Sequence, residues 1–125
     1  MTASILIVDD SRLVRAMVRG ALEEDHHHVR DVPDAKSAIE DLDRAPADLV
    51  ITDVNMPDID GLSLVRLLRG RPRERFMPIL VLTTESADTM KQQGREAGAT
   101  GWLVKPFDPA RLREVVLRVL PRTRT

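Results

Sequence analysis

Short apolar runs alternate along this chain with longer stretches in which apolar residues recur every three or four positions. The runs are three or four residues long and are typical of strands, because a helix would need at least about ten residues. They lie at residues 5–8, 49–52, 79–82 and 102–104, and a weaker strand with two charged residues is expected at 29–32. The periodic stretches predict helices with one apolar face. They lie at residues 13–22, 35–42, 62–68, 87–97 and 112–120.

Polar residues that favour the start of a helix stand just before each periodic stretch. We expect them to begin or cap the five helices, because their side-chain oxygens can accept from free backbone N–H groups. These residues are Ser11, Asp34, Asp60, Ser86 and Asp108. The fourth helix is the weakest, because Gly94 lies inside it and an interior glycine costs about 1 kcal/mol relative to alanine.

The order of elements is strand then helix, repeated five times with short connections. Such alternation predicts an α/β fold in which a parallel sheet carries helices on both faces. Right-handed crossovers favour a doubly wound open sheet, and there are too few units for an eight-stranded barrel. We therefore predict one domain over residues 1–125, in which residues 121–125 form a basic tail.

Composition excludes several classes of protein. The chain has 19 Lys and Arg against 20 Asp and Glu, and a net charge of −1 argues against a dedicated nucleic-acid or acidic-membrane binder. It has no cysteine, which excludes disulfides, thiol catalysis and thiolate metal sites. No apolar run approaches the length of a membrane span, and the first strand starts too early for a signal peptide. We expect a cytoplasmic protein.

Polar residues follow the predicted strands where each one ends. All carboxyl ends of a parallel sheet lie at one edge, where ligands bind. The residues brought together there are Asp9, Asp10, Asp53, Thr83 and Lys105. Three carboxylates repel one another, and one lysine compensates only part of their charge. A hard divalent cation such as Mg²⁺ would supply the rest, while lysine and threonine are suited to phosphoryl oxygens.

Asp53 is the candidate nucleophile among these carboxylates. Asp9 and Asp10 are adjacent, so their side chains diverge and suit direct and water-mediated contacts to a metal. Asp53 stands alone at the end of the central strand, before a loop with Pro57 and Gly61. A carboxylate that attacks phosphorus forms an acyl phosphate.

These motifs together resemble the receiver domain of bacterial two-component response regulators, which has the flavodoxin-like fold with strand order 2-1-3-4-5. The matching residues are Asp9-Asp10, Asp53-x-x-Met56-Pro57-x-x-Asp60-Gly61, Thr83 and Lys105-Pro106-Phe107. The resemblance implies that Asp53 accepts a phosphoryl group from a histidine kinase. It also implies that Mg²⁺ is bound by Asp9, Asp10, Asp53 and the backbone carbonyl of Asn55. Thr83 and Lys105 would contact the phosphoryl oxygens, and the Lys105–Pro106 peptide would be cis.

The resemblance further implies a switch in which Thr83 moves toward the phosphoryl group and Trp102 fills the space it leaves. Because only a short tail follows the last helix, we expect a stand-alone regulator of the chemotaxis type. Its output would be a protein partner bound at the face of the fourth helix, fifth strand and fifth helix. We expect a monomer or weak dimer, with no catalysis beyond its own phosphorylation and dephosphorylation.

Other functions stay open at this point. A phosphate sink or a phosphorelay intermediate would use the same site. A phosphatase or phosphotransferase working through an aspartyl phosphate is disfavoured, because no insertion could form a substrate pocket or lid. A flavodoxin-like nucleotide binder is disfavoured too, because no glycine-rich loop follows the first strand.

Two further polar clusters have simpler interpretations. His26, His27 and His28 could suggest a metal, but adjacent residues of an extended segment point to opposite faces, so we interpret them as a solvated strand entry. A run of arginines is interpreted as a solvated face rather than a nucleic-acid site. It consists of Arg66, Arg69, Arg71, Arg73 and Arg75.

Overall fold

The protein is described by a computed structural model that covers residues 2–84 and 87–120. Strands and helices alternate along it, as the sequence pattern predicts. The strands are β1 (Ser4–Val8), β2 (His28–Val32), β3 (Leu49–Asp53), β4 (Ile79–Thr83) and β5 (Gly101–Val104). The helices are α1 (Arg12–Glu23), α2 (Ala35–Arg44), α3 (Gly61–Arg69), α4 (Ala87–Ala97) and α5 (Pro109–Val119). Among these described helices, none combines the length and apolar character needed to cross a membrane.

The five strands form one parallel sheet in the order β2-β1-β3-β4-β5, which confirms the predicted fold class. The register pairs Val8 with Thr52 between β1 and β3, and Asp53 with Leu82 between β3 and β4. Thr83 pairs with Val104 between β4 and β5. The carboxyl ends of the strands therefore lie level with one another at one edge, where the candidate residues of the sequence meet.

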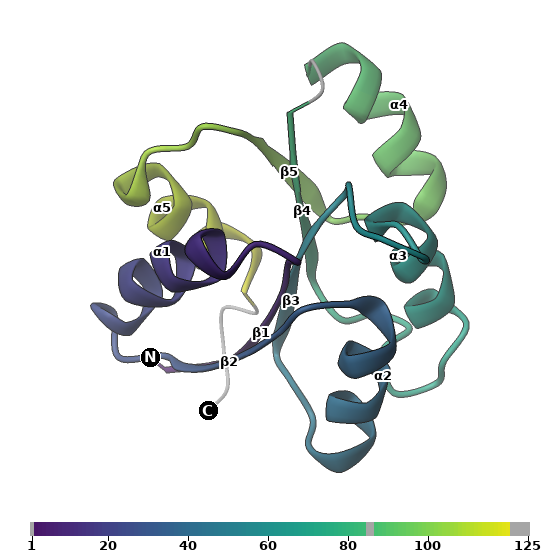
Figure 1. Cartoon of the computed structure of the whole chain (residues 1–125), viewed down its shortest axis with the longest axis horizontal. Helices are drawn as coiled ribbons and strands as arrows, with labels where there is room; N and C mark the ends of the chain where they lie inside the picture. The colour runs from purple at the N-terminus through teal and green to yellow at the C-terminus, as the bar shows by residue number, and fades with distance from the viewer. Residues whose placement is uncertain (1, 85–86, 121–125) are drawn as a thin grey trace.

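Helices cover both faces of the sheet. Figure 1 shows α1 and α5 on one side and α2, α3 and α4 on the other. Successive residues of a strand point to opposite faces, so Ile5 and Ile7 belong to the core under α1 and α5. Leu6 and Val8 belong to the core under α2, α3 and α4. Burial on both faces explains why these strands read as continuous apolar runs.

Capping side chains fix the starts of four helices as predicted. Ser11 accepts from the Val14 N–H of α1 at 3.2 Å. Each of the other three is an aspartate that accepts from a backbone N–H in the first turn of its helix. They are Asp34 of α2, Asp60 of α3 and Asp108 of α5. The predicted cap Ser86 and the predicted basic tail lie outside the described residues.

The interpretation of the three histidines as a solvated strand entry is wrong for His27. His26 and His28 are exposed, but His27 is only 5% exposed. Its Nδ1 accepts a hydrogen bond from the backbone N–H of Ala3 at 3.1 Å and so ties the start of the chain to β2. Its buried Nε2 has no partner among the described residues. A ring that accepts at Nδ1 is neutral, because a protonated ring has only donors.

His27 should therefore make the fold sensitive to acid. Burial lowers the pKa of the His27 ring below its ordinary 6.5, and the charge of Asp25 offsets only part of this. The stability that His27 contributes is complete above the ordinary pKa and is lost as the pH falls below it. We expect His27→Gln to flatten the pH dependence of the unfolding free energy on the acid side of neutrality. The change should be at most about 1.4 kcal/mol per pH unit, measured by urea denaturation.

His28→Gln is the matched control, because this neighbouring ring is exposed. It should leave the acid-side slope as it is in the parent protein. Equal slopes in the His27 variant and the parent would show that the buried ring does not control acid sensitivity.

The interpretation of the arginine run as a solvated face is wrong for two of its five members, Arg69 and Arg71, which are partly buried. Arg69 is half-buried and donates to the carbonyl oxygens of Gly98 at 2.9 Å and Met77 at 2.6 Å. It joins the end of α4 to the loop before β4. Burial lowers the pKa of Arg69, although its guanidinium stays charged.

Arg71 and Arg73 also bind other parts of the chain. Arg71 donates to the buried Glu74 at 2.5 Å and to Asp43 at 2.6 Å. Arg73 is exposed, as the sequence predicts, and also donates to the carbonyl oxygen of Leu42 at 2.8 Å. These side chains therefore connect the α3–β4 loop to α2.

Candidate functional site

Three carboxylates meet at the carboxyl edge of the sheet. Asp9 and Asp10 follow β1, and Asp53 is the last residue of the neighbouring strand β3. One oxygen from each side chain lies within 4.8 Å of the others. Asp9 is 1% exposed and Asp53 is 4% exposed, whereas Asp10 faces solvent. The arrangement matches the cluster expected from the sequence.

Lys105 is the counter-ion of this cluster. Its Nζ donates to Asp53 Oδ1 at 2.9 Å and lies 3.5 Å from Asp9 Oδ2. Burial lowers the pKa of Lys105, but the hydrogen bond to Asp53 and the charges of both carboxylates outweigh it and raise that pKa overall. The lysine is therefore charged at neutral pH. The Lys105–Pro106 peptide is cis, as the resemblance implies.

The surroundings of Asp9 disfavour the ionised form of its carboxyl group. Burial raises the pKa of its carboxyl above the ordinary value, and the charge of Asp53 adds to the rise. The Ser11 N–H, which donates to Asp9 Oδ1 at 2.8 Å, acts in the opposite direction, as does Lys105. One ammonium thus faces two buried carboxylates and a third exposed one, which leaves the pocket with excess negative charge.

The predicted switch residues lie beside the cluster. Thr83 is fully buried at the end of β4, and its carbonyl oxygen accepts from the Lys105 N–H at 2.7 Å. Trp102 on β5 pairs with Val81 of β4 and packs, half-buried, against the core under α4. A Cβ at Gly94 of α4 would lie 3.8 Å from the Trp102 ring, which is ordinary van der Waals contact, so the ring lies directly beside this glycine. The two residues are therefore on neighbouring strands, with Trp102 two residues nearer the amino end.

The loop after β3 depends on a glycine whose role the sequence reasoning did not identify. The sequence indicated Gly61 only as a turn residue. A Cβ at Gly61 would lie 2.0 Å from the backbone oxygen of Asp53 and 2.8 Å from the Cα of Val54. The Gly61 N–H donates to the Val54 carbonyl at 2.8 Å. This close approach turns the loop back on the strand that carries Asp53 and leaves Asn55 exposed beside it.

The site is suited to a divalent cation and a phosphoryl group. Its oxygens are hard carboxylate ligands gathered within one ion's reach, which is the donor set that Mg²⁺ prefers. A carbonyl oxygen in the loop after Asp53 could complete it, as expected for Asn55. Lys105 offers a positive charge to phosphoryl oxygens, and Asp53 offers a carboxylate oxygen as nucleophile.

Comparisons with known proteins agree with this geometry. The family described as the response regulator receiver domain matches residues 5–117. The regulatory protein VanRc of Enterococcus gallinarum is 35% identical over 124 residues, which are 99% of this chain and 51% of VanRc. The chain therefore spans about half the length of that relative.

Two solved structures are similar over almost the whole chain. CheY4, a chemotaxis response regulator of Vibrio cholerae, is 42% identical with a TM-score of 0.91, over 96% of this chain and all of CheY4. The receiver domain of the sensor histidine kinase PA1611 of Pseudomonas aeruginosa is 27% identical with a TM-score of 0.85. That match covers 95% of this chain and 98% of the PA1611 domain, whose structure has a magnesium ion coordinated in the active-site cleft.

Proposed function

Because the chain belongs to the response regulator receiver domain family, we propose that it is a binding switch driven by phosphorylation of Asp53. The observation that carries the proposal is the buried Asp53 carboxylate, which lies 2.9 Å from the Lys105 ammonium within a cluster of carboxylates. The phosphodonor would be a phosphohistidine of a histidine kinase. The likeness to a receiver domain from a sensor histidine kinase supports this pairing.

The proposed transfer uses residues already in position. An oxygen of Asp53 attacks the phosphorus, the P–O bond forms as the P–N bond breaks, and the imidazole leaves with that electron pair and is protonated from solvent. Lys105 neutralises charge on the phosphoryl oxygens, and the hydroxyl of Thr83, which ends the strand next to that of Asp53, would also contact them. A bound Mg²⁺ supplies further charge stabilisation to these oxygens. Asp9, Asp10, Asp53 and the Asn55 carbonyl would hold it.

The output of the switch would be a protein partner at the face of α4, β5 and α5. Thr83 accepts a backbone hydrogen bond from Lys105, the residue after β5, and this contact would pass a movement at the site to that strand. Trp102 lies on that strand and lines a surface groove of about 280 Å³ together with Arg111 and Val115 of α5. A change in the position of its ring would alter both the groove and the packing against α4. The likeness to CheY4 supports a chemotaxis role.

We propose that the chain acts on its own in the cytoplasm, as a monomer or weak dimer, and has no enzymatic activity on other substrates. A phosphate sink or a relay intermediate would use the same chemistry at Asp53. Transfer of the phosphoryl group from this protein to a histidine phosphotransfer protein would favour the relay. A change in the affinity for a partner would favour the switch.

Treatment with Mg²⁺ and acetyl phosphate or beryllofluoride tests the proposal. We expect acetyl phosphate to add one phosphoryl group, detected by mass spectrometry, and both reagents to change Trp102 fluorescence. Both responses should disappear in Asp53→Asn. Asp58→Asn is the matched control, because Asp58 is an exposed carboxylate of the same loop, and Asn tolerates its positive φ of 67°. A parent protein that stays unmodified, or an Asp53→Asn variant that still responds, would refute phosphorylation at this residue.

A further inference from the structure

The backbone of Asp9 is held on both sides of its Cα. Its N–H donates to the Val32 carbonyl of β2 at 3.1 Å. Its carbonyl oxygen accepts from Arg15 Nη1 of α1 at 2.6 Å. Its carboxylate is fixed separately by Ser11 and Lys105. Asp9 is therefore held through its backbone and its side chain, and of the two backbone bonds the one from Arg15 is not part of the sheet.

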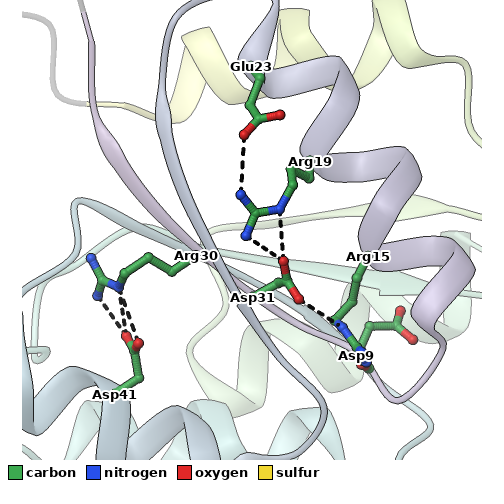
Figure 2. Close-up of polar contacts among 7 residues, drawn as sticks. All are labelled: Asp9, Arg15, Arg19, Glu23, Arg30, Asp31 and Asp41. Atoms are coloured by element: carbon green, nitrogen blue, oxygen red, sulfur yellow. Dashed lines mark hydrogen bonds and ion pairs between the residues drawn. The ribbon is translucent and has the colours of Figure 1, made fainter.

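Arg15 is itself held by a second set of charged contacts, shown in Figure 2. Its Nε donates to Asp31 Oδ1 at 3.0 Å. The other oxygen of Asp31 accepts two bonds from Arg19, at 2.6 Å and 2.9 Å, and Arg19 also reaches Glu23. The Arg15 side chain is 16% exposed. A guanidinium fixed at one nitrogen by a carboxylate presents its other nitrogens in a rigid fork, here toward the Asp9 carbonyl.

The hydrogen bond from Arg15 to the Asp9 carbonyl also affects the placement of Asp10. The carbonyl of Asp9 and the N–H of Asp10 belong to the same planar peptide unit, so fixing the oxygen fixes the direction in which the chain enters Asp10. The Asp10 side chain is exposed and has no hydrogen bond or ion pair within the described part of the chain. Its carboxylate depends on its own backbone for placement beside Asp9 and Asp53.

We propose that Arg15, held by Asp31, is a positioning residue for the cation site. It orients the Asp9–Asp10 peptide so that both carboxylates face the position of the ion. The inference rests on the proposed function in one respect, namely that the cluster binds Mg²⁺. Groups that orient metal ligands in this way typically change metal affinity by about 10- to 100-fold when they are removed.

A purely structural role and a positioning role predict opposite changes in Mg²⁺ affinity. Removing a positive charge near three carboxylates should tighten cation binding by simple electrostatics. Losing the orientation of the Asp9–Asp10 peptide should weaken it. The substitution is also mild for the fold, because Asp31 keeps both bonds from Arg19 after Arg15 is replaced.

The test is a Mg²⁺ titration of the full chain, followed by backbone amide NMR shifts of the loop after β1. We expect Arg15→Gln to raise the Kd about tenfold. Arg15→Lys keeps the charge but not the fork and should also weaken binding. Arg12→Gln removes an exposed charge from the same helix and should leave the Kd unchanged or lower it.

Arg30→Gln is the control for a lost ion pair. Arg30 on β2 also pairs with an aspartate of another element, donating to Asp41 of α2 at 2.7 Å and 2.9 Å, and in Figure 2 this pair lies apart from Asp9. The Mg²⁺ Kd of Arg30→Gln should equal that of the parent protein, even if the melting temperature of the variant is lower. Equal or tighter binding by Arg15→Gln would make Arg15 a structural residue only. A parent protein that binds no Mg²⁺ would instead overturn the proposed function.

Discussion

Replacing Gly61 with alanine is expected to lower the free energy of unfolding by about 3 kcal/mol, which is at the upper end for overpacking. The added Cβ would lie 2.0 Å from the Asp53 oxygen, 2.8 Å from the Asp53 carbonyl carbon and 2.8 Å from the Val54 Cα. All three are backbone atoms, so no side-chain rotation can relieve the contact. The loop must move away from β3, and the Gly61–Val54 hydrogen bond must lengthen. Urea denaturation without phosphodonor measures the loss directly.

The same displacement should reach the chemistry, because the carbonyl of Asp53 belongs to the residue proposed to accept the phosphoryl group. We therefore expect Gly61→Ala also to slow labelling by acetyl phosphate. Gly20→Ala is the matched control, since a Cβ at Gly20 in α1 would meet nothing within 4 Å. That change should stabilise the protein by about 0.5–1 kcal/mol through helix propensity. A Gly61→Ala variant as stable as the parent would mean that the loop has more freedom than this approach implies.

The sequence predicted the carboxyl edge well because two simple periodicities determine it. Short unbroken apolar runs such as residues 5–8 and 79–82 predict strands that are covered on both faces. In a parallel sheet the carboxyl ends of such strands lie at the same edge. The meeting of Asp9, Asp53 and Lys105 can therefore be predicted without knowing any distance between them. The cluster and its lysine counter-ion follow from chain order alone.

Contacts between segments distant in the sequence were harder to predict. The three histidines gave no sign that His27 would turn inward, because its acceptor role depends on a single N–H at Ala3, on a neighbouring segment. Arg69 shows the same difficulty, since its partners are carbonyl oxygens, which every residue carries and no pattern distinguishes. Neither the alternation of the histidines nor the density of the arginines therefore showed which side chains are buried.

The contacts of Arg15 could be predicted only in part. Arg15 and Arg19 are four residues apart and so share one face of α1, and Asp31 is a carboxylate on the strand that follows this helix. Those two facts could have suggested an ion pair between α1 and β2. The bond from Arg15 to the Asp9 carbonyl could not be inferred, because it depends on how far α1 is tilted over the sheet.

Replacing Lys105 with methionine is expected to lower the free energy of unfolding in the absence of Mg²⁺ by about 3 kcal/mol, as for other buried ion pairs that lose one partner. The Lys105 ammonium is shared by Asp53 at 2.9 Å and Asp9 at 3.5 Å, and both carboxylates are buried. Methionine would fill the space but leave those charges facing each other. Mg²⁺ should restore part of the loss, because the cation would replace the missing charge. Urea denaturation with a chelator and with saturating Mg²⁺ gives the two values.

Two companion variants decide whether charge is the cause. Lys36→Met removes an exposed lysine of α2 and should change stability by less than about 0.5 kcal/mol. Asp53→Asn removes one of the repelling carboxylates, so it should stabilise the metal-free protein and should rescue Lys105→Met when the two changes are combined. If Asp53→Asn instead melts at a lower temperature without Mg²⁺, the ion pair with Lys105 outweighs the repulsion from Asp9. Lys105 would then compensate the carboxylates without a cation. Mg²⁺ would stabilise the folded protein less than three uncompensated carboxylates suggest.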